Sequence, residues 1–308
     1  METRASTAAS SLVVGREDVS AYVGLGVATM GWAIAFIVGK LVLTGMTPLA
    51  VGVWRYAAAG AILVPFLLRD PTRRHLREVV LPLAVMTVAG GVIYPWLFLE
   101  ALARTSATNT SLLIALNPVF TVLLAPLVVG ESLTRRKAAG LVVALAGAVL
   151  VITRGDLGLV ARLGFAAGDL MAVVAAGMWA IFNLASRRVV GLVSPSVINS
   201  VVYSISGLAL YAIGFSEAPV AQLASASVSI WLGIFAMAMV SSVIAGQFFL
   251  SGVRVVGVSR AVVFVYLVPV LTAVLASIVL DERFTAGQAI GGFAVLLGVA
   301  LASRTDRS

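Results

Sequence analysis

The sequence predicts an all-α membrane protein with ten transmembrane helices, built as a 5+5 inverted-topology repeat. The first observation is composition: of the 308 residues, 61% are hydrophobic and 11% charged, and the mean hydropathy is +1.09. So few charges cannot cover the surface of a water-soluble protein of this length. The second is a set of uncharged runs, each near or above the about 20 residues that a spanning helix needs. They cover residues 19–39, 79–99, 105–130, 189–216, 218–253, 261–280 and 284–303.

Boundaries set by charge, proline and glycine divide these runs into individual helices. We expect helices at residues 20–42, 48–68, 79–102, 106–128, 136–153, 165–186, 195–215, 228–252, 258–279 and 286–303. Three starts carry a helix-capping signal. They are the N-cap and proline pairs Thr47-Pro48 and Ser194-Pro195, and the capping-box pair Thr285 and Gln288.

The distribution of positive charge predicts the orientation. Of the 21 Lys and Arg residues, fifteen lie on one side of the predicted membrane, five lie on the other, and Arg55 lies inside a predicted helix. Cytoplasmic loops retain positive charge during insertion. We therefore expect a multi-pass protein of the bacterial inner membrane with both termini in the cytoplasm. Residues 1–18 are predicted to be a disordered cytoplasmic tail without a signal peptide, and residues 304–308 a short cytoplasmic tail.

A third observation, an internal repeat, supports the fold class. An offset of 147 residues relates Trp32 to Trp179 and Tyr56 to Tyr203, and an offset of 151 relates Pro118 to Pro269 in the later helices. Because each half has five helices, equivalent loops must lie on opposite sides of the membrane. The basic segment 69–78 corresponds to segment 216–228, which lacks Lys and Arg. The predicted repeats are residues 19–153 and 154–303.

Several classes of function are not expected. The net charge of +8 arises from loops between apolar runs, so no nucleic-acid partner is predicted. The chain has no cysteine and one histidine, His75 in a charged loop, so neither a metal site nor another cofactor is predicted. The protein could instead be an intramembrane enzyme, but its sequence shows no nucleophile with a neighbouring base. The expected partners are a small-molecule substrate and the lipid bilayer.

Three motifs resemble those of the drug/metabolite transporter superfamily, in particular its EamA-type members. They are an ALxxTSA turn, a mid-helix proline and a Gly-Glu pair before a glycine-rich helix. The first half has Ala101–Ala107, Pro118-Val119-Phe120, Gly130–Thr134 and Gly140; the second has Ser251–Arg254, Pro269-Val270, Asp281–Thr285 and Gly291. The resemblance implies a ten-helix exporter of amino acids or other small metabolites, most similar to bacterial aromatic amino-acid exporters. A drug, cation or nucleobase exporter of the same fold stays open.

In an inverted-repeat transporter the solute site is expected near the bilayer midplane, where the two halves meet. Rocking of the halves would open this site to one side of the membrane and then to the other. The aromatic candidates could instead pack helices or anchor them at the interface. Asn183 could instead bond a neighbouring helix. Arg55 and Glu100 could bind a substrate or pair as a structural lock. The candidates are Trp32, Phe36, Arg55, Tyr56, Tyr94, Trp96, Glu100, Trp179, Asn183, Tyr203 and Tyr266.

Other residues are expected to shape the helices. Pro118 and Pro269 each remove a helix hydrogen bond and are candidates for hinges or static kinks. Glu131 and Glu282 precede helix N-termini, where capping is expected and gating is the alternative. Small residues give two helices close-packing faces that could also serve a homodimer. These are Gly140, Ala144, Gly147, Gly291 and Gly298.

Overall fold

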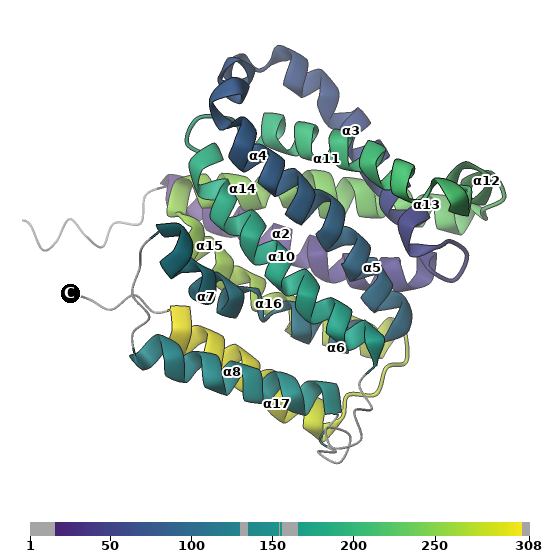
Figure 1. Cartoon of the computed structure of the whole chain (residues 1–308). Coiled ribbons are helices and arrows are strands. Elements are labelled where there is room, and N and C mark those ends of the chain that lie inside the picture. The colour runs from purple at the N-terminus through teal and green to yellow at the C-terminus, as the bar shows by residue number, and fades with distance from the viewer. Residues whose placement is uncertain (1–15, 130–134, 154, 156–165, 304–308) are drawn as a thin grey trace, which may run out of the picture.

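A computed structural model describes residues 16–129, 135–153, 155 and 166–303, and within these residues every regular element is a helix (Figure 1). Among the described residues, six uninterrupted helical segments are long and apolar enough to cross a membrane. They are Val19–Val42, Pro48–Arg69, Pro71–Arg104, Ala167–Val189, Pro195–Ile213 and Val228–Val256. Residues 1–15 and 304–308 of the predicted tails, and Glu131, lie outside the described residues. The prediction of a disordered tail is wrong for residues 16–18, which form the first turn of α2.

The helices follow the predicted order with small shifts at their ends. The first half contains α2 (Arg16–Val42), α3 (Pro48–Arg69), η1 (Pro71–Val79), α4 (Val80–Met86), η2 (Thr87–Ile93), α5 (Tyr94–Arg104), α6 (Ala107–Ile114), α7 (Asn117–Val129) and α8 (Arg135–Thr153). The second half contains α10 (Ala167–Val189), α11 (Pro195–Ile213), η3 (Phe215–Glu217), α12 (Pro219–Ala224), α13 (Val228–Ala236), η4 (Met237–Ile244), α14 (Ala245–Val256), α15 (Val258–Val265), α16 (Leu267–Val279) and α17 (Ala286–Ser303).

The predicted helix starts are confirmed by their capping contacts. Thr47 and Ser194 adopt extended backbone and accept hydrogen bonds from amides in the first turns of α3 and α11, each of which begins with proline. Thr285 and Gln288 form the reciprocal bonds of a capping box at the start of α17. Local sequence therefore determines these three boundaries.

Two predicted helices, 106–128 and 258–279, are wrong as continuous elements. The first divides into α6 and α7, and the second into α15 and α16. A proline ring clashes with the carbonyl four residues earlier and supplies no N–H to it. The first helix of each pair ends at that residue: α6 at Ile114, four before Pro118, and α15 at Val265, four before Pro269. In the first break, the side-chain Nδ2 of Asn117 donates to the Ile114 carbonyl at 3.2 Å.

Two other helices contain a π-helical turn that the apolar pattern did not predict. It occupies η2 between α4 and α5, and η4 between α13 and α14. The offset of 151 residues places the two turns at equivalent positions of the repeats. Such turns widen the helix locally and are frequent at functional sites.

Packing between helices follows the repeat. Helix α2 packs on α14 and α16, and its repeat mate α10 packs on the corresponding α5 and α7. The mates α3 and α11 lie side by side, as do α8 and α17 (Figure 1). An inverted repeat predicts this exchange of equivalent contacts between the halves.

The small-residue faces bring the backbones of α8 and α17 together. A Cβ atom added at Gly147 would lie 2.6 Å from the carbonyl oxygen of Gly291, and one added at Gly291 would lie 2.7 Å from that of Gly147. At Gly298 the added atom would lie 2.4 Å from the backbone nitrogen of Ala144. These glycines therefore make a contact within one chain, which supports the packing interpretation.

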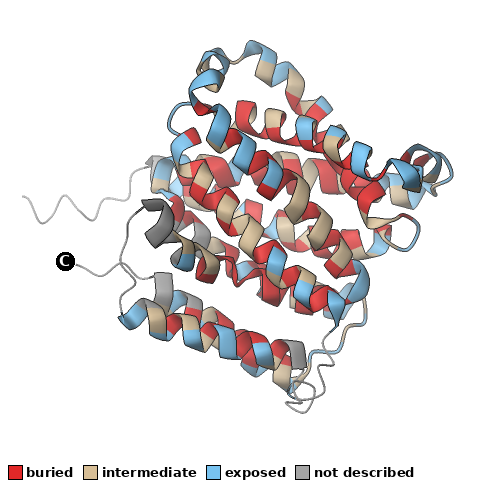
Figure 2. Ribbon diagram, in the orientation of Figure 1, coloured by how far each residue is buried: buried red, intermediate tan, exposed pale blue. Residues whose placement is uncertain are grey.

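Large apolar side chains are exposed on the outward faces of the bundle, while buried residues lie on the inward faces (Figure 2). Leu81, Leu208 and Ile278 are each more than 70% exposed. Soluble monomers rarely expose such a surface, because its contact with water is unfavourable. The exposed faces are suited to lipid.

The ends of α3 and α11 are connected by hydrogen bonds between the halves. At the α3 C-terminus, the Ser194 hydroxyl donates to Asp70 Oδ2 at 2.6 Å, and the Ser194 amide donates to Thr72 Oγ1 at 3.1 Å. At the opposite end, the Thr47 amide donates to Gln222 Oε1 at 2.9 Å. These contacts connect one end of α3 to the start of α11 and the other end to α12, which follows α11.

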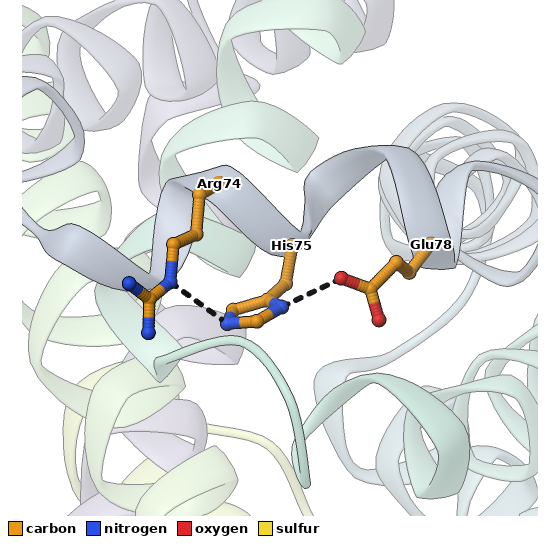
Figure 3. Close-up of polar contacts among 3 residues, drawn as sticks. All are labelled: Arg74, His75 and Glu78. Carbon is orange, nitrogen blue, oxygen red and sulfur yellow. Dashed lines mark hydrogen bonds and ion pairs between the residues drawn. The ribbon is translucent and has the colours of Figure 1, made fainter.

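The basic segment after Asp70 forms η1 on the surface of the bundle (Figure 3). Arg74 Nε donates to His75 Nε2 at 3.1 Å, and His75 Nδ1 lies 2.7 Å from Glu78 Oε1. Both contacts are exposed to solvent, where ion pairs contribute little to stability. The single histidine of the chain is therefore accounted for as a surface residue.

Asp70 gives a prediction on pH. The hydrogen bonds from Ser194 and Thr72 lower the pKa of the Asp70 carboxyl below its usual value. Its stabilising contribution is therefore present above the unfolded-state pKa of about 3.9 and is lost as pH falls through the lower native-state pKa. We expect Asp70→Asn to lower the melting temperature at pH 7, and this difference to shrink towards pH 3. A difference that is constant across the range would contradict the linkage.

Candidate substrate cavity

A cavity of about 60 Å³ lies at the centre of the bundle, lined by residues from both halves. Helices α2, α3, α5, α10, α11 and α14 contribute most of the lining, together with both π-helical turns. Small-molecule sites usually measure several hundred Å³, whereas this space has room for a few water molecules. In this conformation the cavity is therefore smaller than a typical small-molecule site.

Repeat mates face one another across the cavity. The rings of Trp32 and Trp179 meet edge to face with centroids 5.7 Å apart, and those of Tyr56 and Tyr203 lie 4.8 Å apart. All four line the cavity, as do Phe36 and Tyr94. The sequence repeat thus places equivalent aromatic residues around one central point.

The aromatic walls are held in place by contacts behind them. Trp32 Nε1 donates to the Ser241 carbonyl in η4 at 3.1 Å. Trp179 stacks on Phe182 with centroids 4.7 Å apart and an interplanar angle of 12°. A Cβ atom at Gly90, in η2, would lie 2.3 Å from the Phe182 ring, so the small residue lets the ring approach. The π-helical turn η4 therefore positions Trp32 directly, and η2 positions Trp179 through Phe182.

Arg55 is the one charged side chain among the described residues that line the cavity. It is 6% exposed and its Nε donates to Ser242 Oγ at 2.9 Å. The guanidinium carbon lies 5.3 Å from the centre of the Tyr56 ring, a cation–π distance. Within the described part of the chain Arg55 forms no ion pair, so the predicted lock between Arg55 and Glu100 is not formed.

Five sequence candidates lie away from this cavity. Glu100 pairs with Arg104 and accepts from Trp96 Nε1 at 3.3 Å. Asn183 is fully buried, and neither polar atom of its side chain has a hydrogen-bond partner in the described structure. Pro269 lines the cavity, whereas Pro118, its equivalent in the first repeat, does not. The candidates outside the lining are Trp96, Glu100, Asn183, Tyr266 and Pro118.

Several residues in the cavity lining or directly behind it were not predicted from the sequence. Phe98 and Phe249 both line the cavity and are themselves repeat mates at the offset of 151, so the repeat could have revealed them. Ser242, the partner of Arg55, had no such signal, because its orientation depends on the π-helical turn η4. Phe182 was hidden in an ordinary apolar stretch.

Charged side chains connect the helices at one end of the bundle. This is the end at which α5 meets α6, called the α5–α6 end below. Glu282, from the second half, accepts from the Ala107 amide at 2.7 Å and from the amide and hydroxyl of Thr108. Lys40 Nζ donates to the carbonyls of Leu102 and Thr105 at 2.6 and 2.7 Å. Glu282 therefore caps the start of α6 and Lys40 the end of α5, each with the charge that the helix dipole favours.

A series of hydrogen bonds between buried polar side chains adds further connections at this end. Gln288, at the start of α17, donates to Asn109 Oδ1 at 2.6 Å, and Asn109 Nδ2 donates to Asp169 Oδ1 at 3.3 Å. Asp169 is 2% exposed at the start of α10. Together with Glu282, these contacts link α6 to both α10 and α17 at the α5–α6 end. Asp169 was not among the sequence candidates.

Comparison with known proteins is consistent with this architecture. A Bacillus subtilis protein named uncharacterized transporter YyaM is 27% identical over 274 residues, covering 88% of this chain and 90% of its own. A probable terminal-alkyne amino-acid exporter of Streptantibioticus cattleyicolor is 28% identical over 283 residues, covering 89% and 90%. A solved crystal structure, 20% identical, has a TM-score of 0.60 over 92% of this chain and 96% of that chain.

The model of the EamA-like transporter family matches residues 19–153 and again residues 166–304. Two matches in one chain agree with the internal repeat, and together they cover most of the described helices. The chain is thus a multi-pass membrane transporter that belongs to the EamA-like transporter family.

Proposed function

We propose that this transporter exports small solutes that carry a carboxylate and an apolar or aromatic body, among them neutral amino acids. The observation that carries the proposal is the central cavity, in which one buried arginine lies among paired aromatic residues. Aromatic rings offer a stacking surface, and a guanidinium pairs with a carboxylate in a bidentate geometry. The printed name of the Streptantibioticus relative, an amino-acid exporter, supports the same substrate class.

The proposed mechanism is alternating access in a 5+5 inverted bundle of ten crossings. Six segments are long enough to span by themselves, and the broken pairs α6–α7 and α15–α16, with α8 and α17, would supply the other four. The cavity would open when the halves rock about its centre, with Pro118 and Pro269 as hinges. Both termini would face the cytoplasm of a bacterial cell, so that the α5–α6 end faces outward.

A cation or drug exporter is less well supported by the cavity. Such a carrier would be expected to hold a deep carboxylate that binds its cation. No acidic residue lines the central cavity in the described part of the chain, and its charge is positive. A nucleobase would leave Arg55 without a counter-ion.

The test is uptake by purified protein in proteoliposomes, with radiolabelled amino acids, nucleobases and quaternary ammonium compounds, with and without a proton gradient. We expect uptake of phenylalanine and similar neutral amino acids, and none of the quaternary compounds. The reverse preference would overturn the proposal.

The aromatic pair gives a second measurement in the same assay. Trp32→Ala and Trp179→Ala should reduce phenylalanine uptake about tenfold more than alanine uptake, because each removes a ring that an aromatic substrate would contact. Trp231→Ala is the matched control, since Trp231 is 49% exposed on the outer surface. Equal losses for both substrates would show that the pair only packs the helices.

A further inference from the structure

Arg55 carries a positive charge for which the described protein supplies no counter-ion. Its only hydrogen bond in the described structure is from Nε to the neutral hydroxyl of Ser242. The two terminal nitrogens of the guanidinium are without a partner there, and the side chain borders the cavity. The free donors of Arg55 are therefore available to a solute.

An arginine side chain stays charged in proteins, so this charge can be compensated only by an anion or by polar groups nearby. Leaving the charge unpaired in a low-dielectric interior is costly. The Ser242 hydroxyl and the ring of Tyr56 offset part of this cost, but each of these interactions is weaker than an ion pair. An anion that entered the cavity would pair with the Arg55 guanidinium and compensate its charge.

Neighbouring hydroxyls add donors of the same kind. Tyr56 and Tyr94 line the cavity, and neither hydroxyl has a hydrogen-bond partner in the described structure. The guanidinium carbon of Arg55 lies 5.3 Å from the centre of the Tyr56 ring, and Tyr94 borders the same cavity. Two oxygens of a carboxylate match such a set of donors.

The cavity has no corresponding site for an ammonium group. No carboxylate borders it in the described residues. Two of the aromatic faces that could hold a cation are already in contact: Trp179 is stacked on Phe182, and Tyr56 lies beside Arg55 itself. An ammonium about 7 Å from the guanidinium would also be repelled by it, enough at an effective dielectric constant near 20 to weaken binding about tenfold or more.

We propose that the Arg55 site selects apolar organic monoanions that lack an ammonium group, such as aryl-alkanoates, over the zwitterionic amino acids with the same side chain. This inference rests on the proposed function, because it assigns the solute's carboxylate to the central cavity. A monoanion brings the net charge of the cavity to zero, whereas a zwitterion leaves it positive.

Three probes with one phenyl ring separate the contributions: 3-phenylpropanoate has only the carboxylate, phenylalanine has both charges, and phenethylamine has only the ammonium. Binding to the purified full-length protein is measured at pH 7 by isothermal titration calorimetry. We expect 3-phenylpropanoate to bind at least tenfold more tightly than phenylalanine, and phenethylamine to bind most weakly. Phenylalanine binding as tightly as 3-phenylpropanoate would overturn the inference.

Variants at Arg55 assign the effect to this residue. Arg55→Gln should weaken 3-phenylpropanoate binding by a hundredfold or more and leave phenethylamine no weaker than before. Arg55→Lys, which keeps the charge but loses the bidentate geometry, should retain part of the affinity. Arg104→Gln is the control, because Arg104 pairs with Glu100 outside the cavity. Size-exclusion profiles matching the wild type establish that each variant is folded.

The outcomes also separate this inference from the proposed function. Phenylalanine uptake in proteoliposomes without tighter binding of 3-phenylpropanoate would leave the proposed function intact and overturn the inference. Absence of binding and uptake for all three probes would overturn both. Unchanged 3-phenylpropanoate affinity in Arg55→Gln and Arg55→Lys would show that the carboxylate binds elsewhere.

Discussion

Replacing Glu282 with alanine should expose the central cavity from the α5–α6 end. The Glu282 carboxylate accepts three hydrogen bonds from Ala107 and Thr108, and so connects the second half to the first turn of α6. Hydrogen bonds to a charged group contribute about 1.5–3 kcal/mol each, and 1.4 kcal/mol corresponds to a factor of ten in an equilibrium. We therefore expect the open population to rise at least tenfold.

The absence of cysteine from the chain makes this measurable. A single cysteine at Ala35, which lines the cavity on α2, reports access through its rate of reaction with a membrane-impermeant thiol reagent. The rate should rise about tenfold in the Glu282→Ala background, and less in Glu282→Gln, which keeps one acceptor oxygen. Glu217→Ala is the control, since the Glu217 carboxylate makes no hydrogen bond in the described structure. An unchanged rate would show that Glu282 only caps α6.

Gly147→Ala should lower the melting temperature of the purified protein by several degrees. The new Cβ atom would lie 2.6 Å from both the Gly291 carbonyl oxygen and the Val295 backbone nitrogen, and backbone atoms cannot move aside as a side chain can. Overpacking of this kind costs about 1–3 kcal/mol. The intrinsic helix propensity acts in the opposite direction, because alanine is favoured over glycine by up to about 1 kcal/mol.

The matched control isolates the steric effect. Gly26 lies in the middle of α2, and a Cβ atom added there meets nothing within 4 Å. Gly26→Ala should therefore leave the melting temperature unchanged or raise it, while Gly147→Ala lowers it. If both variants changed stability in the same direction, close contact between α8 and α17 would not explain the glycine at position 147.

The distribution of apolar residues predicted the helices, because each membrane-spanning helix is a long uncharged segment. Its side chains are either buried or in contact with lipid. The capping residues Thr47, Ser194 and Thr285 were equally predictable, since a cap depends on residues within one turn of itself. The two prolines indicated irregular helices. They could not tell a kink from a complete break, because that depends on whether neighbours such as Asn117 satisfy the freed carbonyls.

The candidate cavity was predictable only where the repeat made it so. The pairs Trp32 with Trp179 and Tyr56 with Tyr203 were found because a two-fold arrangement brings equivalent residues to its axis. Glu100 was misplaced because its depth in the helix does not specify which face it occupies, and Arg104, one turn later, provides a partner. Asp169 was missed because its burial depends on Asn109, 60 residues away.

The sequence by itself determined the class of protein, its helices and its internal duplication, because hydropathy, capping and repetition are properties of short or regularly spaced segments. Only the tertiary structure decided that Arg55 faces the cavity without an acidic partner among the described residues, that Glu282 caps α6 from the other half and that α8 packs on α17. Each of these depends on the distance between side chains far apart in the chain, which is set when the helices pack.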